Sequence, residues 1–166
     1  MTLWTGQSPE FWKAFCGSDA WCHRMAGRTV ADDRDAVHQT ADEVFGTLDA
    51  DDWRQAFAAH PRIGDLDSLR MKFAGNRRWS SGEQSGMAGV DERTLRDLQT
   101  ANETYFERFG YIFIICATGR SAGEMLSACR SRLAHGPAEE LPVAAAEQRK
   151  ITHLRIDKHD REPETP

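Results

Sequence analysis

The stretch DERTLRDLQTANETYFERFGYIFIICATGRSAGEML, residues 91–126, decides the fold class of this chain. Apolar side chains in its first half recur at the spacing of one helical face, and they are Leu95, Leu98, Tyr105, Phe106 and Phe109. Asp91 can cap the start of such a helix, and Gly110 suits the left-handed conformation in which helices often end. We therefore expect a long amphipathic helix that begins at Asp91 and is closed by Gly110.

The next residues, Tyr111 to Cys116, are too few for a helix and are rich in isoleucine and aromatic side chains. This pattern is typical of a buried extended segment or strand. No second strand pattern in the chain offers it a partner, so its buried amides and carbonyls need a ligand, water or a helix terminus instead. Ser121 and Glu124 then form a capping-box pattern, which predicts another helix to about Ala134.

Helix start signals also precede four apolar patterns nearer the N-terminus. We expect two short helices, one from Ser8-Pro9 to Phe15 and one from Ser18 to about Gly27. A longer helix should start at Asp32 or Asp33, and the next should run from Asp49 to about His60. It should stop there because Pro61 disfavours helical geometry in the residue before it.

The remaining regions are less regular. Residues 61–79 lack periodicity and hold two glycines, so we expect a long ordered loop, of a kind that is often functional. Ser80 to Glu83 forms a capping box, which predicts a short helix. The last helix should run from about Pro142 to Lys158, with a buried face of Val143, Ala146, Ile151 and Leu154. The tail at 159–166 is expected to be disordered.

Together these patterns predict an all-α protein: a single-domain bundle of about eight helices over residues 1–158, with one extended segment at about 111–116 crossing it. The net charge of −5 argues against nucleic acid or an anionic membrane as the main partner. The longest apolar run, Tyr111 to Ala117, is too short to span a bilayer. Since no signal peptide is visible, we expect a cytoplasmic protein.

The four cysteines form no metal-binding pattern. Cys116 and Cys129 lie in apolar patterns and are interpreted as small buried hydrophobic residues. Cys16, Cys22 and His23 could share a metal ion, but a fourth ligand at a sensible spacing is missing. The sequence therefore predicts no metal site.

Several polar residues could carry chemistry, and each also has a structural explanation. His60 opens the motif HPRIGD at the expected end of a helix, where the helix dipole favours its protonated form; it could also be a simple C-capping histidine. Glu83 could act as a carboxylate or only complete the capping box. Ser80 could donate to a ligand carbonyl, and the Gln84 amide could both donate to and accept from a ureido or imide group.

Arg155 lies late in the last predicted helix, beside its expected apolar stripe. A guanidinium there could grip a carboxylate or a ureido oxygen through two parallel hydrogen bonds, or it could simply be solvated. Taken together, His60, Glu83 and Arg155 supply an acid/base group, a carboxylate and an anion clamp. The local patterns do not say whether the three meet.

With these residues in view, the chain resembles the OHCU decarboxylases of urate degradation. The matching motifs come in the family's order with similar gaps, and they are HPRIGD (60–65), SSGEQSGM (80–87), FGYIFIICATGRSAGEML (109–126) and AAEQRKITHLRID (145–157). The resemblance implies a cofactor-independent carboxy-lyase that converts 2-oxo-4-hydroxy-4-carboxy-5-ureidoimidazoline (OHCU) to (S)-allantoin and carbon dioxide. It also implies an all-α fold and a homodimer.

The resemblance assigns roles to individual residues. It makes His60, Glu83 and Arg155 catalytic, and it implies that a further set contacts or shapes the site for substrate: Pro61, Ser80, Gln84, and the main chain of Ile112, Phe113, Ile114 and Ile115. The chain ends in Glu-Thr-Pro rather than in a peroxisomal tripeptide, so we expect a bacterial cytoplasmic enzyme. Two alternatives stay open, namely a non-catalytic helical module that binds ureides and a hydrolase that acts on a related ureide.

Overall fold

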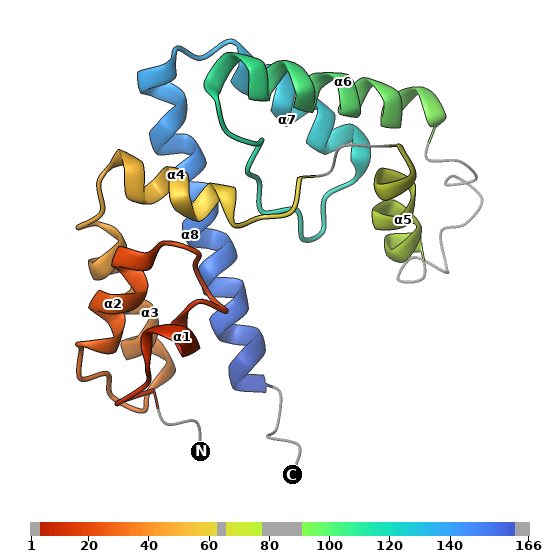
Figure 1. Ribbon diagram of the computed structural model, residues 1–166. Helices are drawn as coiled ribbons and strands as arrows, with labels where there is room; N and C mark the ends of the chain where they lie inside the picture. The colour runs from red at the N-terminus through yellow and green to blue at the C-terminus, as the bar shows by residue number, and fades with distance from the viewer. Residues whose placement is uncertain (1–3, 63–65, 78–90, 162–166) are drawn as a thin grey trace. The chain divides into compact units, whose positions relative to one another are not determined.

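The computed structural model describes residues 4–62, 66–77 and 91–161, and all regular structure in these ranges is helical (Figure 1). This confirms the predicted all-α fold class. The helices are α1 (Pro9–Trp12), α2 (Asp19–Ala26), α3 (Arg34–Phe45), α4 (Ala50–Ala58), α5 (Leu66–Arg77), α6 (Glu92–Phe109), α7 (Ala122–Leu133) and α8 (Pro137–Arg161).

The chain divides into two compact units. The first unit comprises Met1–His60 and Leu141–Pro166, and the second comprises Pro61–Glu140. Helices α1 to α4 and most of α8 belong to the first unit, whereas α5, α6 and α7 belong to the second. Each unit is described by itself below.

The helices of the first unit begin where the polar signals predict. Ser8, Ser18 and Asp49 each accept a hydrogen bond from a main-chain N–H of the following turn. Asp49 and Asp52 bond reciprocally and form a capping box, and α3 begins after Asp33. Each such cap stabilises its helix by roughly 0.5–2 kcal/mol, which explains why the starts could be predicted well.

The core of the first unit is largely aromatic. Its fully buried apolar side chains include Trp12, Trp21, Met25, Val37, Phe57 and Ile156. Burial of one such side chain stabilises the fold by roughly 1.5–3 kcal/mol. Helix α1 ends at Trp12, before the predicted end at Phe15, and residues 13–15 continue as a turn in which Phe15 N donates to the Trp12 carbonyl at 3.0 Å.

Helix α8 differs from its prediction at its start. It begins at Pro137 rather than near Pro142, because a proline is well suited to the first turn, where its missing N–H costs no intrahelical bond. Pro142 lies inside α8.

The buried face of α8 also differs from its prediction. Leu154 is 40% exposed and Ala146 is exposed, whereas Gln148 and Thr152 are buried. The prediction was wrong because it assigned the inner face by hydrophobicity alone. Polar side chains can occupy that face when their hydrogen bonds are satisfied, as those of Gln148 and Thr152 are.

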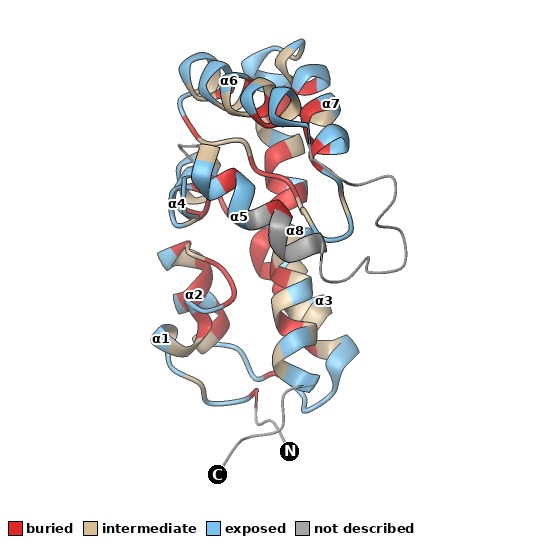
Figure 2. Ribbon diagram, turned by 90° about the vertical axis from the view of Figure 1, so that its right-hand side faces the viewer, coloured by how far each residue is buried: buried red, intermediate tan, exposed pale blue. Residues whose placement is uncertain are grey.

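The second unit is built on α6, which packs against α5 and α7. Asp91 caps α6 and Gly110 ends it with a φ of +80°, both as predicted. Leu95, Leu98 and Tyr105 are buried on one face of α6, and Figure 2 shows buried and exposed residues alternating along this amphipathic helix.

Residues 66–77 form helix α5, so the predicted loop over 61–79 is wrong for this part. Two apolar side chains one turn apart, Leu69 and Phe73, are buried, and two are too few to give a clear periodic signal. Arg70 also grips Glu92 at the start of α6 through two hydrogen bonds of 2.7 and 2.8 Å. The helix is therefore defined by tertiary contacts more than by its own pattern.

Residues 112–117 have no regular secondary structure, and Ile114 and Ile115 in this segment are buried, as predicted. Among the cysteines, Cys129 is buried as predicted and Cys116 is half-buried. Cys16 and Cys22 are buried too, and Cys22 donates to the Cys16 carbonyl at 3.2 Å. In the ranges that the structure describes, no helix combines the length and apolar character that crossing a membrane requires.

Candidate active site

The predicted site residues fall into three groups. His60 and Arg155 lie in the first unit, and Pro61 and the segment Ile112 to Ile115 lie in the second. Ser80, Glu83 and Gln84, together with their predicted short helix, lie outside the residues that the structure describes. The geometry of the first unit is therefore considered first.

His60 lies two residues after the end of α4. The helix ends at Ala58, and His60 N donates to the Phe57 carbonyl at 3.1 Å as the last turn closes. Pro61 comes next, and α4 has ended before it, as predicted from the restriction that a proline places on the preceding residue. The imidazole is thus carried by the turn that closes α4.

Gly17 brings the chain after α1 against the end of α4. A Cβ on Gly17 would collide with the Cβ of Ala59, so only glycine allows this close approach. The approach holds Phe15 and Cys16 near the residues that follow α4.

A chain of hydrogen bonds runs from His60 into the core of the first unit. His60 Nε2 lies 2.6 Å from Gln148 Oε1, Gln148 Nε2 donates to Thr152 Oγ1 at 3.2 Å, and Thr152 Oγ1 donates to the Phe15 carbonyl at 3.1 Å. We call these four groups the His60 relay. Gln148 and Thr152 are buried, so the middle of the relay is shielded from water, whereas His60 at its end is half-buried.

The donors and acceptors of the relay can be assigned in only one consistent way. A carbonyl oxygen can only accept, so the Thr152 hydroxyl gives its proton to Phe15 and its oxygen accepts from the Gln148 amide nitrogen. The amide oxygen of Gln148 is then the acceptor for His60 Nε2–H. In neutral His60 this leaves the lone pair on Nδ1, which makes Nδ1 the basic nitrogen.

The surroundings favour neutral His60. Burial lowers the pKa of the imidazole, the hydrogen bond to Gln148 opposes this, and the positive charge of Arg155 lowers the pKa further, with a net decrease. The helix dipole had been expected to favour the protonated form, and that expectation is wrong here. Burial and Arg155 dominate because they act on the imidazole directly, whereas the dipole effect is modest near solvent.

Arg155 reaches the same main-chain acceptor as the relay. Its Nη1 donates to the Phe15 carbonyl at 3.3 Å, and its side chain is half-buried. Gln148, Thr152 and Arg155 follow one another at spacings of four and three residues, so they share one face of α8. The structure therefore brings His60 and Arg155 together through a network anchored on Phe15.

Cys16 lies beside this network but is not suited to be a nucleophile. Burial raises the pKa of its thiol, and the opposing effects of the Ser18 main chain, Thr152 and Arg155 do not cancel the increase. The thiolate is the reactive form, so a thiol with a raised pKa is inert near neutral pH. Among the described residues, no group of three or more His, Cys, Asp or Glu side chains is arranged to hold a metal ion.

Sequence reasoning missed Gln148, Thr152 and the carbonyl of Phe15. A main-chain carbonyl has no signature in a sequence. Gln148 and Thr152 could have been noticed because they lie four residues apart in the last predicted helix, but the apolar stripe had been placed on another face.

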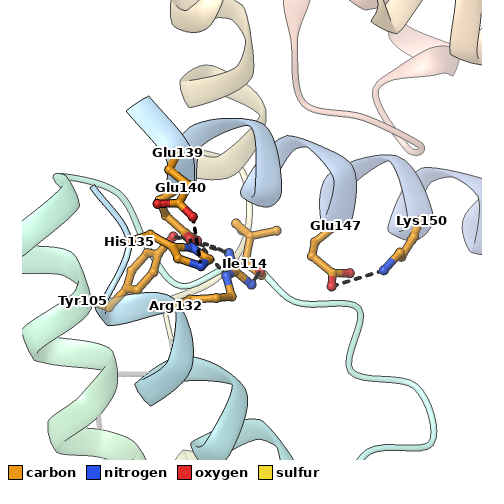
Figure 3. Close-up of polar contacts among 8 residues, drawn as sticks. All are labelled: Tyr105, Ile114, Arg132, His135, Glu139, Glu140, Glu147 and Lys150. Atoms are coloured by element: carbon orange, nitrogen blue, oxygen red, sulfur yellow. Dashed lines mark hydrogen bonds and ion pairs between the residues drawn. The ribbon is translucent and has the colours of Figure 1, made fainter. Parts of the chain in front are cut away.

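In the second unit, the expected unpaired carbonyl of the extended segment has a partner. Arg132 Nη1 donates to the Ile114 carbonyl at 2.6 Å (Figure 3). We use the name Arg132 cluster for Arg132, the Ile114 carbonyl, Tyr105, His135 and Glu140. The sequence predicted a ligand, water or a helix terminus as this partner, and for Ile114 that prediction is wrong because a buried side chain takes the position.

Comparison with known proteins assigns the family. The model of the family described as OHCU decarboxylase matches residues 7–157. The chain belongs to the OHCU decarboxylase family. This confirms the resemblance drawn from the motifs.

Individual relatives of this family agree. The chain is 37% identical over 147 residues to the uric acid degradation bifunctional protein TTL of Arabidopsis thaliana. The matched region is 89% of this chain and 45% of that protein. It thus spans somewhat less than half the length of this relative. It is 28% identical to a 2-oxo-4-hydroxy-4-carboxy-5-ureidoimidazoline decarboxylase of Amia calva over 79% of this chain and 74% of the relative.

Two solved structures share the fold. A crystal structure of OHCU decarboxylase in the presence of (S)-allantoin matches 94% of this chain and 100% of that chain, with a TM-score of 0.73 and 32% identity. A structure of (S)-allantoin synthase matches 90% of this chain and 48% of that chain, with a TM-score of 0.64 and 15% identity. At 15% identity the second match supports the fold alone.

Proposed function

We propose that this member of the OHCU decarboxylase family converts OHCU to (S)-allantoin and carbon dioxide in urate degradation, as a carboxy-lyase that uses no cofactor. The observation that carries the proposal is the His60 relay, which ends in a neutral imidazole with Arg155 anchored beside it on the Phe15 carbonyl. A relative crystallised in the presence of (S)-allantoin, at 32% identity, supports the same substrate class.

The substrate itself can supply the electron sink for this reaction. Loss of carbon dioxide leaves an electron pair on the former C4, and the neighbouring C=N bond accepts it. The former imine nitrogen takes up a proton and becomes N–H. The C4 hydroxyl then gives up its proton and becomes a carbonyl, while the adjacent carbon takes up one proton on a single face. The protein therefore needs to position groups, place charge and move protons.

His60 is the group that we assign to the hydroxyl proton. Its neutral form accepts the proton at Nδ1 while Nε2–H stays bonded to Gln148. The lowered pKa keeps this base unprotonated near neutral pH, and the relay holds it in one tautomer. Arg155 clamps the substrate carboxylate or ureido oxygen with its fork of N–H donors.

The remaining roles follow from the family resemblance. Glu83 holds His60 or the ureido nitrogens, Ser80 and Gln84 bind the ureido and imide groups, and Pro61 shapes the pocket. The main chain of residues 112–115 faces the imidazoline ring. We also expect the protein to be a homodimer and to be cytoplasmic. Light scattering of the purified protein tests whether it is a dimer.

The test is to add the protein to a mixture that makes OHCU fresh from urate and to follow circular dichroism. Rapid appearance of optically active allantoin supports the proposed enzyme. Racemic decay at the spontaneous rate would instead indicate a non-catalytic ureide-binding module. Release of ammonia or urea in place of carbon dioxide would indicate a hydrolase.

A further inference from the structure

The Arg132 cluster surrounds one guanidinium with acceptors and rings in the second unit (Figure 3). Arg132 Nε donates to Glu140 Oε1 at 2.6 Å, and Nη2 lies 2.5 Å from the same oxygen. Its Nη1 is committed to the Ile114 carbonyl. The guanidinium also lies over the Phe113 ring, 4.6 Å from its centroid. One side chain thus holds both a carbonyl and a ring of the extended segment.

Glu140 in turn fixes Arg132. Its side chain has no exposed surface, and it also accepts from Tyr105 Oη at 2.6 Å and lies 2.8 Å from His135 Nδ1. Arg132 is only 9% exposed at its side chain. A buried pair with this many donors on one carboxylate has a single low-energy arrangement, so the direction of Arg132 Nη1 is set before any ligand arrives.

This arrangement orders a segment that has no regular structure of its own. Residues 112–117 lack the repeated main-chain hydrogen bonds of a helix or strand, so side chains must fix their path. Arg132 holds this path at two neighbouring residues, through the Ile114 carbonyl and the Phe113 ring.

We propose that Arg132, held by Glu140, is a positioning residue that fixes the segment around Phe113 and Ile114 in the conformation that faces the imidazoline ring of the substrate. This inference rests on the proposed function, in which the segment faces that ring. Arg132 itself does not touch substrate. Its effect passes through the Ile114 carbonyl and the Phe113 ring.

Arg132→Lys is the informative variant. Lysine keeps the positive charge beside Glu140, but its single ammonium group cannot also reproduce the planar fork that reaches Ile114. We expect amide hydrogen exchange at residues 112–116 to accelerate. We also expect the Kd for (S)-allantoin and the KM for OHCU to rise about tenfold, which corresponds to the net free energy of about one hydrogen bond. The measurements are exchange mass spectrometry, calorimetry and the circular dichroism assay.

Two control variants separate positioning from general loss of stability. Arg70→Lys makes the same chemical change in the same unit, at the Arg70–Glu92 pair, which has no part in the segment. Leu98→Ala removes a buried core side chain of α6 and lowers the melting temperature without altering Arg132. Both should bind (S)-allantoin within about twofold of wild type, since neither releases the Ile114 carbonyl.

The inference is overturned if Arg132→Lys leaves exchange and affinity unchanged, or if Leu98→Ala weakens affinity as much. If Arg132→Lys does not fold, the double variant Arg132→Met with Glu140→Leu replaces the pair by apolar side chains and should show the same loss of affinity. Failure of the proposed function would look different. In that case the wild-type protein would not turn over OHCU at all, and accelerated exchange in Arg132→Lys would still show that Arg132 holds the segment without any role toward substrate.

Discussion

The two units each contain a buried polar network, and the two networks are made of chemically different groups. The His60 relay joins an imidazole, an amide, a hydroxyl and a carbonyl, all of them neutral. The Arg132 cluster joins a guanidinium to a carboxylate whose side chain is fully buried. The first network ends in a group that can exchange a proton, whereas the second ends on a main-chain carbonyl that it immobilises.

The difference in charge predicts a difference in what each network can tolerate. Losing one partner of a buried ion pair strands a charge and costs about 3–5 kcal/mol of stability. Losing one partner of a neutral hydrogen bond costs about 1–3 kcal/mol. The charged cluster is therefore suited to holding backbone in place, and the neutral relay to tuning a base.

Glu140→Ala should give the largest loss of stability. Arg132 would then be a buried charge without its carboxylate, and we expect the free energy of unfolding to fall by about 3–5 kcal/mol in urea denaturation. Glu139→Ala is the matched control. Glu139 is the neighbouring carboxylate, but its side chain is largely exposed and its contact with His135 is long, at 3.6 Å. It should cost less than about 1 kcal/mol. Equal losses in the two variants would contradict the buried role of Glu140.

Gln148→Leu should give an intermediate effect. Leucine fills much of the volume but leaves His60 Nε2–H and Thr152 without their partner, which costs about 1–3 kcal/mol. The imidazole is also no longer held in one tautomer, so we expect kcat to fall by about tenfold or more. Gln148→Glu sharpens the test, because a carboxylate there should raise the pKa of His60 and move the acidic limb of the pH–rate profile to higher pH. Unchanged profiles in both variants would remove the relay from the mechanism.

The pH dependence of stability should show the smallest effect. Because folding lowers the pKa of His60, the unfolded chain binds the proton more readily. Stability from this residue is complete above the ordinary histidine pKa of about 6.5 and decreases as the pH falls through that value toward the folded pKa. His60→Asn should flatten this part of the curve, measured as unfolding free energy between about pH 7 and 5.

Asp42, elsewhere in the first unit, should affect the same stability curve in a different pH range. Burial tends to raise the pKa of Asp42, but hydrogen bonds from Arg149 and His153 outweigh it and hold the pKa below its usual value. Its contribution to stability is therefore lost only at more acidic pH, below about 4. If His60→Asn altered the curve only in that acidic range, the assignment of a lowered pKa to His60 would be wrong.

Sequence reasoning worked where local chemistry decides the structure. Asp91 and Gly110 mark the ends of α6 because a cap and a left-handed turn each need particular residue types. It failed where packing decides. Helix α5 depends on Leu69, Phe73 and an ion pair to α6, and none of these contacts is visible along the chain.

The same division holds for the candidate site. His60 could be selected because Pro61 follows it at a helix end, and Arg155 because it lies beside the expected apolar stripe of the last helix and within a family motif. Gln148 was not selected, because a buried amide looks like an exposed one until its partners are known. The lowered pKa of His60 was likewise hidden, since it depends on burial and on Arg155, which is distant in sequence.

The central claim is that the neutral His60 imidazole, held by Gln148, moves the proton that completes decarboxylation of OHCU. The most direct measurement is the rate at which optically active allantoin appears when fresh OHCU is mixed with wild-type protein or with His60→Asn. We predict rapid formation of (S)-allantoin by the wild type and a rate about 10²–10⁴-fold lower in a folded His60→Asn variant. A His60→Asn rate within a few-fold of wild type would contradict the account.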